Sequence, residues 1–280
     1  MNLFEKQSRL NQLFAQSPVN AAYLAGSLSN RSTFGQLSDV DVAVLMMDQI
    51  KADEFLDYQL YFLSELAKRM ESDTIDVVIL NQASLLLKLQ VIKNGQILFS
   101  RNEKQRVTFE TRAVMDYLDF KKFDDIQNQA LGRRLYGHRL PLDKSLVQNF
   151  LQQLQGAVKI LQELSQHPLE EFTQDYHIYA LAERYMQIAI ESCLSTCSTL
   201  IAAFGLRRGE SYHELLSIIA SQNIISRALA YRLELLINLR DTLVHEPEML
   251  NRELLYDYMQ HNLGDFNDFV ATIEEKKRDV

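Results

Sequence analysis

Two aspartates at the start of an apolar run restrict the fold of this chain more than any other feature. In the segment from Ser38 to Val44, two aspartates two positions apart open an apolar run. Residues i and i+2 of a β-strand point to the same face, so Asp39 and Asp41 are expected to project from one face and the valines from the other. Neighbouring carboxylates repel each other unless a positive charge lies between them. A divalent cation that carries nucleotide phosphates is the usual solution. The segment therefore predicts a strand with part of a Mg²⁺ site.

A third carboxylate, Asp76, lies in the β-branched run 75–80, which reads as a buried strand. An isolated charge in such a strand costs on the order of several kcal/mol unless it is paired or bound to metal. If this strand lies beside the strand of Asp41, Asp76 completes a three-acid site for two Mg²⁺ ions, one at the attacking oxygen and one at the triphosphate. An Asp-x-Asp pair alone more often marks a solvated strand end.

The order of these segments is more specific than any one of them. A short apolar run, 21–25, leads into Gly26 and Ser27, and the loop to Ser38 and the two aspartates follows. This order resembles the nucleotidyltransferase superfamily of the DNA polymerase β type, most closely its minimal nucleotidyltransferase branch. The resemblance implies nucleotide binding by Gly26, Ser27 and Ser38, metal binding and catalysis by Asp39, Asp41 and Asp76, Mg²⁺ as cofactor and ATP as substrate.

The loop between Ser27 and Asp39 departs from the family. It is slightly longer than the usual spacing, its glycine, Gly35, comes late, and Arg31 stands alone where the family has an arginine with an early glycine. Arg31 is either a phosphate contact or a solvated loop residue. This difference in the loop does not affect the three aspartates. It concerns the contacts by which the loop would bind the triphosphate.

Composition limits the partners of the chain. Its 280 residues are enough for two domains, and a net charge of −8 argues against broad electrostatic binding of nucleic acid or anionic membrane. RNA is therefore expected only at a local site. The sequence shows no signal peptide and no uninterrupted apolar run of membrane-spanning length, which predicts a cytoplasmic protein without membrane contact. Cys193 and Cys197 are expected to be buried fillers rather than a disulfide framework.

Periodicity changes along the chain and predicts two domains, 1–137 and 138–280. Gly132, Gly137 and Pro141 mark the boundary. Before it we expect strands at 21–25, 40–46, 75–80 and 95–99, the last an edge strand, and helices at 3–16, 51–70, 82–93 and 103–134. After it we expect helices at 143–164, 171 or 176 to 204, 211–220, 224–245 and 250–275. The predicted fold is an α+β nucleotidyltransferase domain with a mixed sheet, followed by an all-α bundle.

Arg240 and His245 form an R-x4-H pair near the end of the predicted helix 224–245. In isolation such a pair merely suits a helix C-terminus, where positive side chains complement the macrodipole. The order of the helices, with the run 182–191, Gly205 and the segment 211–215, is similar to the HEPN family over about residues 143–275. That resemblance implies a metal-independent ribonuclease site assembled across a homodimer, in which Asp241 also belongs to the motif.

The chemistry of the pair fits that implication. A guanidinium can bind a scissile phosphate, and a histidine with a pKa of about 6.5 can take a proton from a 2′-hydroxyl or return one to the leaving oxygen. Arg240 and His245 are five residues apart, about 140° around a helix, so they do not share a face. We therefore expect a two-fold partner to supply the opposite residues.

One position departs from the HEPN proteins that are paired with a minimal nucleotidyltransferase. Pro247 stands where those proteins carry a tyrosine that accepts AMP. Tyr256 and Tyr258, on the next predicted helix, are either substitute acceptors or residues at the edge of the core.

Three functions remain open from the sequence. The first is a Mg²⁺-dependent nucleotidyltransferase that moves AMP from ATP, fused to a HEPN ribonuclease-like domain of the toxin–antitoxin type. The second is a small-molecule nucleotidyltransferase of the aminoglycoside type, in which the helical domain, Arg240 and His245 are purely structural. The third is a binding module with both sites inert, which the intact acids argue against. The R-x4-H pair separates the first from the second, because the second class does not need it.

Overall fold

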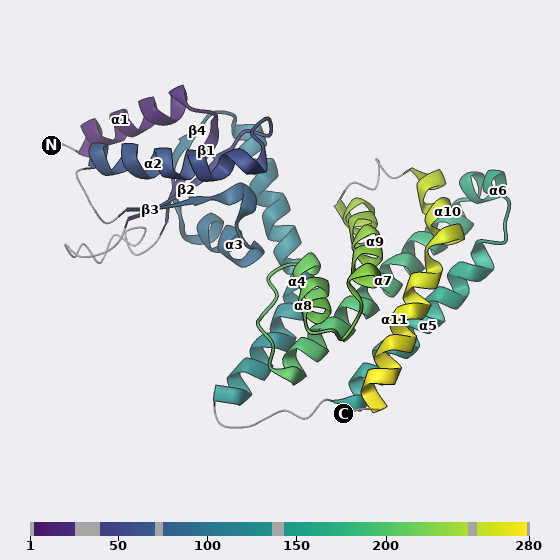
Figure 1. Cartoon of the computed structure of the whole chain (residues 1–280). Helices are drawn as coiled ribbons and strands as arrows, with labels where there is room; N and C mark the ends of the chain where they lie inside the picture. The colour runs from purple at the N-terminus through teal and green to yellow at the C-terminus, as the bar shows by residue number, and fades with distance from the viewer. Residues whose placement is uncertain (1–2, 26–39, 71–74, 136–142, 246–250, 279–280) are drawn as a thin grey trace. The chain divides into compact units, whose positions relative to one another are not determined.

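The computed structural model describes residues 3–25, 40–70, 75–135, 143–245 and 251–278 (Figure 1). The chain divides into two compact units, Met1–Asp119 and Phe120–Val280. The division falls inside helix α4, Glu103–Leu135, so the two ends of one helix belong to different units. The boundary predicted between Gly137 and His138 lies outside the described residues and stays a prediction.

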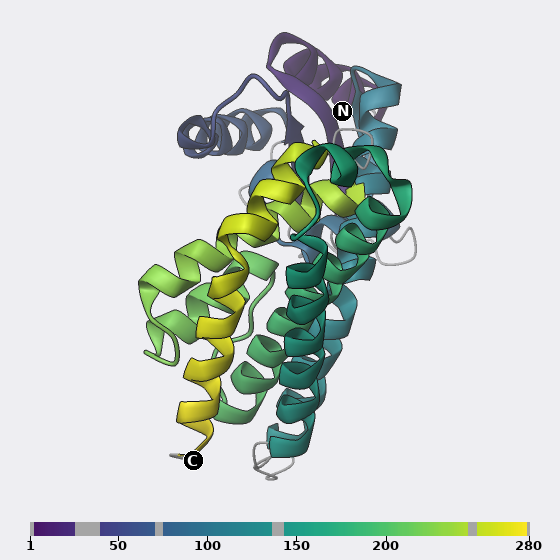
Figure 2. The ribbon, with the colours of Figure 1, turned by 90° about the vertical axis from the view of Figure 1, so that its right-hand side faces the viewer.

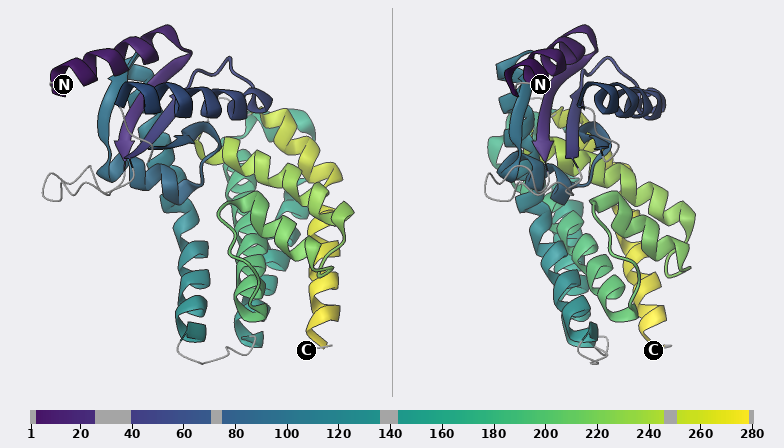
Figure 3. Two further views of the ribbon diagram at one scale, coloured as in Figure 1. Left: turned by 60° about the vertical axis from the view of Figure 1, so that its left-hand side comes forward. Right: turned by 90° about the vertical axis from the view of Figure 1, so that its left-hand side faces the viewer.

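The first unit is built on a four-stranded mixed sheet in the order β3-β2-β1-β4. Its strands are β1 (Val19–Ala25), β2 (Val40–Met46), β3 (Ile75–Ile79) and β4 (Gln96–Ser100). β1 pairs antiparallel with both β2 and β4, whereas β2 pairs parallel with β3. The predicted mixed sheet and the edge position of the last strand are therefore confirmed. Figure 3 shows this sheet in two further views.

Both faces of the sheet are packed. Val42 and Val44 join a buried cluster with Phe14 of α1 (Leu3–Gln16) and Phe62 of α2 (Phe55–Met70). The intervening residues, such as Ala43, pack in a second cluster with α3 (Leu85–Asn94) and the first half of α4. A short 3-10 helix precedes α2 at Ala52–Glu54, and another follows β3 at Leu80–Gln82. The two-residue period of β2 thus divides its side chains between two cores.

Arg101 ties β4 to the end of α1. Its Nε donates to the carbonyl of Val19 at 2.8 Å, and one Nη donates to the carbonyls of Phe14, Ala15 and Ser17 at 3.0, 2.8 and 2.8 Å. A charged donor of this kind satisfies carbonyls that a helix end leaves open. Arg101→Met is therefore expected to lower the free energy of unfolding by about 1.5–3 kcal/mol, the usual worth of hydrogen bonds to a charged group.

Urea unfolding followed by circular dichroism measures this effect. Arg9→Ala is the matched control, because Arg9 is another exposed arginine of the same unit, and we expect it to change stability by less than about 0.5 kcal/mol. Equal curves for Arg101→Met and the unmodified chain would contradict the role given to Arg101.

In its described residues the second unit contains helices and no strand, as predicted. Besides the second half of α4 it contains α5 (Lys144–Leu164), α6 (Leu169–Gln174), α7 (Tyr176–Phe204), α8 (Tyr212–Ser221), α9 (Arg227–His245), α10 (Arg252–His261) and α11 (Leu263–Arg278). α7 packs against α5, α8 and α9 and forms the centre of the unit. Figure 2 shows α5 and α11 lying along each other.

α7 is the one described helix that is long and apolar enough, by composition, to cross a membrane, but 72% of its most apolar window is buried within the protein. It is therefore accounted for as the core helix of the unit. Cys193 and Cys197 are buried in it as free thiols, as expected. Burial raises the pKa of the Cys197 thiol well above its ordinary value.

Local signals set several helix ends correctly. Gly205 closes α7 in the left-handed conformation with φ of 69°, which glycine adopts without steric cost. Ser211 caps α8 by accepting a hydrogen bond from the Glu214 N–H at 3.3 Å. The Glu214 carboxylate accepts a hydrogen bond from the N–H of Glu210 at 2.8 Å, one residue before the cap.

The single helix predicted at 250–275 is wrong. The structure ends α10 at His261, with Asn262 as its cap, and starts α11 at Leu263. Both helices contact α7, but the break lets α10 pack on α6 and α11 pack on α5 and α9. Asparagine is a weak former of helix interiors and a common cap, which fits its place at the break.

Residues 120–135, the second half of α4, lie in the compact helical unit. Phe120 and Phe123 are 2% and 1% exposed, and both pack edge-on against Tyr212 of α8. Burial of these two rings assigns the second half of α4 to the helical unit by packing.

Candidate functional site

The strand register brings three motif segments to one edge of the sheet. Asp41 of β2 is the Cα partner of Asp76 in the parallel pair with β3. The same Asp41 is the partner of Ala25 in the antiparallel pair with β1, and Gly26 directly follows Ala25 in the chain. The glycine–serine segment, the Asp-x-Asp segment and the third acid therefore begin from neighbouring backbone positions, although 35 residues separate Asp41 from Asp76 in the sequence.

Asp76 is exposed, which corrects the expectation of a buried charge. Val77 and Ile79 carry the buried face of β3, and the alternation of the strand turns Asp76 away from it. The Asp76 carboxylate accepts the N–H of Val77 at 2.8 Å. Because water can hydrate the exposed Asp76 carboxylate, Asp76 does not need a metal ion or a charged partner to offset the free-energy cost of burial.

The other predicted residues of this site fall outside what the structure describes. Gly26, Ser27, Ser38 and Asp39 lie in the undescribed range 26–39, and the side chain of Asp41 is also undescribed. Among the described side chains no group of three His, Cys, Asp or Glu residues could hold a metal ion. Asp76 nevertheless fits the implied group, since an exposed carboxylate is the oxygen ligand that Mg²⁺ prefers.

A polar network anchors β1 close to this edge. The Tyr23 hydroxyl donates to Glu110 at 2.9 Å, and Arg106 pairs with both Glu110 and Glu103. Burial and the neighbouring Glu110 raise the pKa of Tyr23, so this phenol stays protonated as the donor. The network fixes α4 to the strand that leads into Gly26.

Arg240 does not lie on the surface of the helical unit. Its side chain is 3% exposed, and its guanidinium carbon is 4.7 Å from the ring centroid of Tyr212. A guanidinium over an aromatic face is held by the ring quadrupole. The sequence predicted a phosphate-binding arginine and gave no sign of this burial.

The pair Arg240 and His245 is therefore not assembled on one face of α9. The helix runs unbroken through His245, so the backbone keeps the two positions about 140° apart, as the sequence implied. The side chain of His245 lies outside the described part, as do Asp241's side chain and all of Pro247.

The two tyrosines considered as AMP acceptors are engaged with backbone carbonyls. The Tyr256 hydroxyl donates to His167 at 2.9 Å, and the Tyr258 hydroxyl donates to Leu235 at 3.5 Å. Both side chains are half-buried, and the Tyr256 ring packs on Phe172 at 5.2 Å. These contacts match the interpretation of the two residues as edges of the core.

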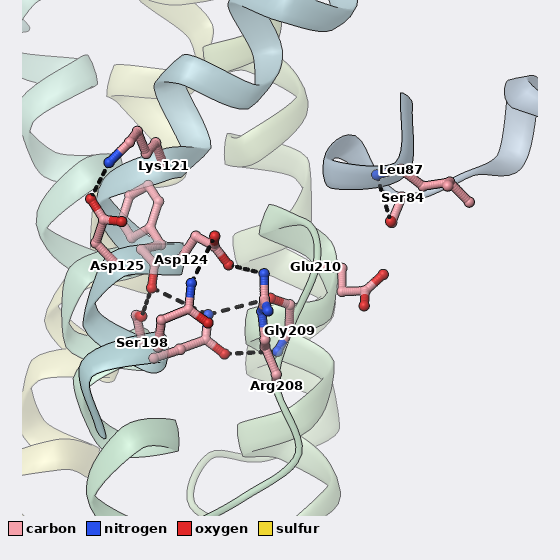
Figure 4. Close-up of polar contacts among 12 residues, drawn as sticks. Ser84, Leu87, Lys121, Asp124, Asp125, Ser198, Arg208, Gly209 and Glu210 are labelled. Carbon is pink, nitrogen blue, oxygen red and sulfur yellow. Dashed lines mark hydrogen bonds and ion pairs between the residues drawn. The ribbon is translucent and has the colours of Figure 1, made fainter. Parts of the chain in front are cut away.

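The clearest group that the sequence did not reveal is a polar clamp between α4 and the segment before α8 (Figure 4). Asp124 forms an ion pair with Arg208. The Gln127 Oε1 accepts the N–H of Gly209 at 2.8 Å, and its Nε2 donates to the Gly209 carbonyl at 3.3 Å. The residues that the polar clamp joins are more than 80 positions apart in the sequence, so no local sequence pattern could have revealed the clamp.

Comparison with known proteins gives two family matches in this chain. Residues 8–104 match the family described as Polymerase beta, Nucleotidyltransferase, and residues 154–273 match the family described as Ribonuclease HepT-like. The mRNA nuclease HepT of Shewanella oneidensis is 25% identical over 104 residues, which cover 37% of this chain and 78% of that protein.

Solved structures give weaker likenesses. A toxin–antitoxin structure with AMP-PNP is 22% identical, with a TM-score of 0.45, and covers 47% of this chain and 99% of that chain. The cytosolic protein YutE of Bacillus subtilis is 21% identical, with a TM-score of 0.44, and covers 48% of this chain and 90% of that one. By the two family matches, this chain joins a nucleotidyltransferase domain of the polymerase β type to a HepT-like HEPN domain.

Proposed function

We propose that the first unit transfers AMP from ATP with Mg²⁺ bound by Asp39, Asp41 and Asp76. The observation that carries the proposal is the register that pairs Asp41 with Asp76 and puts Ala25, the residue before Gly26, beside them. Carboxylates at this edge suit a hard divalent cation, which would neutralise the triphosphate and activate the attacking oxygen. Gly26, Ser27 and Ser38 would orient the phosphates.

The proposal is tested by calorimetry with a non-hydrolysable ATP analogue. We expect binding in the presence of Mg²⁺ and a loss of binding when a chelator removes the metal, because the acids would then repel the phosphates. Equal binding with and without metal would contradict a metal-dependent site.

We propose that the acceptor of AMP is a protein side chain, as in a system of the toxin–antitoxin type. Intact mass after incubation with Mg-ATP detects it, since each transferred AMP adds a fixed mass to the chain or to an added protein. Modification only of an added cationic small molecule would instead favour the aminoglycoside-type alternative. Pro247 has no hydroxyl, and the hydroxyls of Tyr256 and Tyr258 already donate to carbonyls, so self-modification is expected to be weak.

For the helical unit we propose a ribonuclease-like site around Arg240 and His245, with RNA bound locally rather than over the acidic surface. The family match over residues 154–273 supports the ribonuclease-like site. We also propose that the protein is located in the cytoplasm. In this proposal the histidine moves the proton and the arginine binds the phosphate once it is accessible.

A homodimer through the helical unit is the matching prediction. The two motif residues lie about 140° apart on α9, so one chain cannot present both to one phosphate, and a second copy can. Light scattering is expected to give about twice the chain mass of 32.4 kDa. A strict monomer at micromolar concentration would argue against a site shared by two copies.

A further inference from the structure

We propose that Tyr212, held in place by the second half of α4, is a positioning residue that keeps the guanidinium of Arg240 away from RNA. The proposal rests on the proposed ribonuclease-like site and adds its regulation. The group formed by Tyr212, Phe120 and Phe123 is called the aromatic cover.

The first support is the contact at Arg240 itself. Its side chain is 3% exposed, and Tyr212, which covers it at 4.7 Å from ring centroid to guanidinium carbon, is 6% exposed. A phosphate that binds a guanidinium takes hydrogen bonds along its edge, which requires the group to reach the surface. Arg240 must leave the ring or the ring must move before RNA can be bound there.

The second support is the packing behind Tyr212. Its ring makes edge-to-face contacts with Phe120 at 5.4 Å and with Phe123 at 5.7 Å, at interplanar angles of 73° and 87°. Both phenylalanines belong to α4 and are buried. Tyr212 is thus fixed between Arg240 on one side and α4 on the other, so it cannot swing away without disturbing that helix.

The third support is the polar clamp described above, which fastens α4 to the backbone just before Tyr212. Asp124 is 2% exposed and pairs with Arg208, and Gln127, 4% exposed, bonds both backbone groups of Gly209. Ser198 of α7 adds a hydrogen bond to the Phe123 carbonyl at 3.0 Å. Buried polar groups that are hydrogen-bonded to one another favour one arrangement of the elements they join.

Two of the three rings of the aromatic cover come from outside the HepT-like part of the chain. That match spans residues 154–273, whereas Phe120 and Phe123 precede it on a helix whose first half belongs to the nucleotidyltransferase unit. Tyr212, the ring over Arg240, is therefore packed against the helix that the two units share. A displacement of α4 would reach Arg240 through the single ring of Tyr212.

The test measures the access of a reagent to Arg240 in the full chain. Phenylglyoxal modifies accessible guanidinium groups, and peptide mass spectrometry gives the rate at each arginine. Arg227, exposed on the same helix, is the fast reference, and Arg106, 8% exposed in the other unit, is the slow one. In the unmodified chain Arg240 is expected to react as slowly as Arg106.

Tyr212→Leu removes the aromatic face but keeps an apolar side chain, and Tyr212→Phe is the matched control that keeps the ring. We expect Tyr212→Leu to raise the modification rate of Arg240 by about tenfold or more, the scale of a lost desolvated cation–π contact, and Tyr212→Phe to change it by less than about twofold. The rate at Arg106 should not change in either variant, which excludes general unfolding.

A second variant loosens the clamp and leaves Tyr212 in place. Gln127→Leu is expected to raise the Arg240 rate as well, so the proposal stays testable if Tyr212→Leu does not fold. An Arg240 that reacts as fast as Arg227 in the unmodified chain, or equally slowly in both variants, would overturn the proposal. If the variants expose Arg240 and the purified protein still leaves RNA intact, the role of the aromatic cover is supported and the proposed ribonuclease activity is contradicted.

Discussion

Asp39→Asn, Asp41→Asn and Asp76→Asn, each made alone, are expected to lower Mg²⁺-dependent AMP transfer by at least about 100-fold. Mutation of a residue that only hydrogen-bonds to a metal ligand typically lowers metal affinity or activity by about 10–100-fold. The three aspartates are proposed as the ligands themselves, so their loss should have at least that effect. An amide keeps the size of the side chain but loses the charge that attracts the metal. The measurement is the rate of label transfer from radioactive ATP to protein.

The control for this series is Asp53→Asn, because Asp53 is an exposed acid of the same unit that lies outside the site. We expect it to retain full activity. Asp76→Asn is the most informative member, since only the strand register connects it with the other two acids. Full activity of Asp76→Asn would show that this register does not mark the site.

His245→Ala is expected to lower RNA cleavage by about 10²–10⁴-fold, the usual worth of a positioned general acid or base. We expect cleavage to be latent in the unmodified chain and to need both an inactive transfer site and an open aromatic cover. The effect should therefore be measured in a chain that carries Asp39→Asn, Asp41→Asn and Tyr212→Leu. Expression of that triple variant should slow growth of the host, and the addition of His245→Ala should restore it.

His261→Ala is the control, because His261 is an exposed histidine of the same unit, with a relative exposure of 70%. It should leave the slow growth unchanged. If the triple variant is harmless and the purified protein leaves RNA intact, the R-x4-H pair is a structural remnant and the helical unit serves as a scaffold.

Local patterns were sufficient for most elements of the fold. The apolar run that follows the two aspartates predicted β2, and the structure shows that both faces of this strand are packed. Gly205 and Ser211 marked a helix end and a helix start, because a left-handed residue and a side-chain cap depend on few neighbours. The same is true of the helical period in α5 and α7.

The candidate site was only partly within reach of the sequence. The acids and the R-x4-H pair could be named from their order along the chain, and the sheet does place Asp41 opposite Asp76. The exposure of Asp76 could not be read from its apolar neighbours, because two strand faces alternate and only packing shows which one is covered. The break at Asn262 likewise depends on α10 and α11 meeting different helices.

The sequence by itself determined the two kinds of domain, their order and the side chains with reactive chemistry, since these follow from residue type and short spacing. The tertiary structure alone decided that α4 is shared between the units and that Tyr212 covers Arg240. Phe120 lies 92 residues before Tyr212, and Tyr212 lies 28 before Arg240. Contacts over such separations are fixed by the packing of whole helices, which no local periodicity encodes.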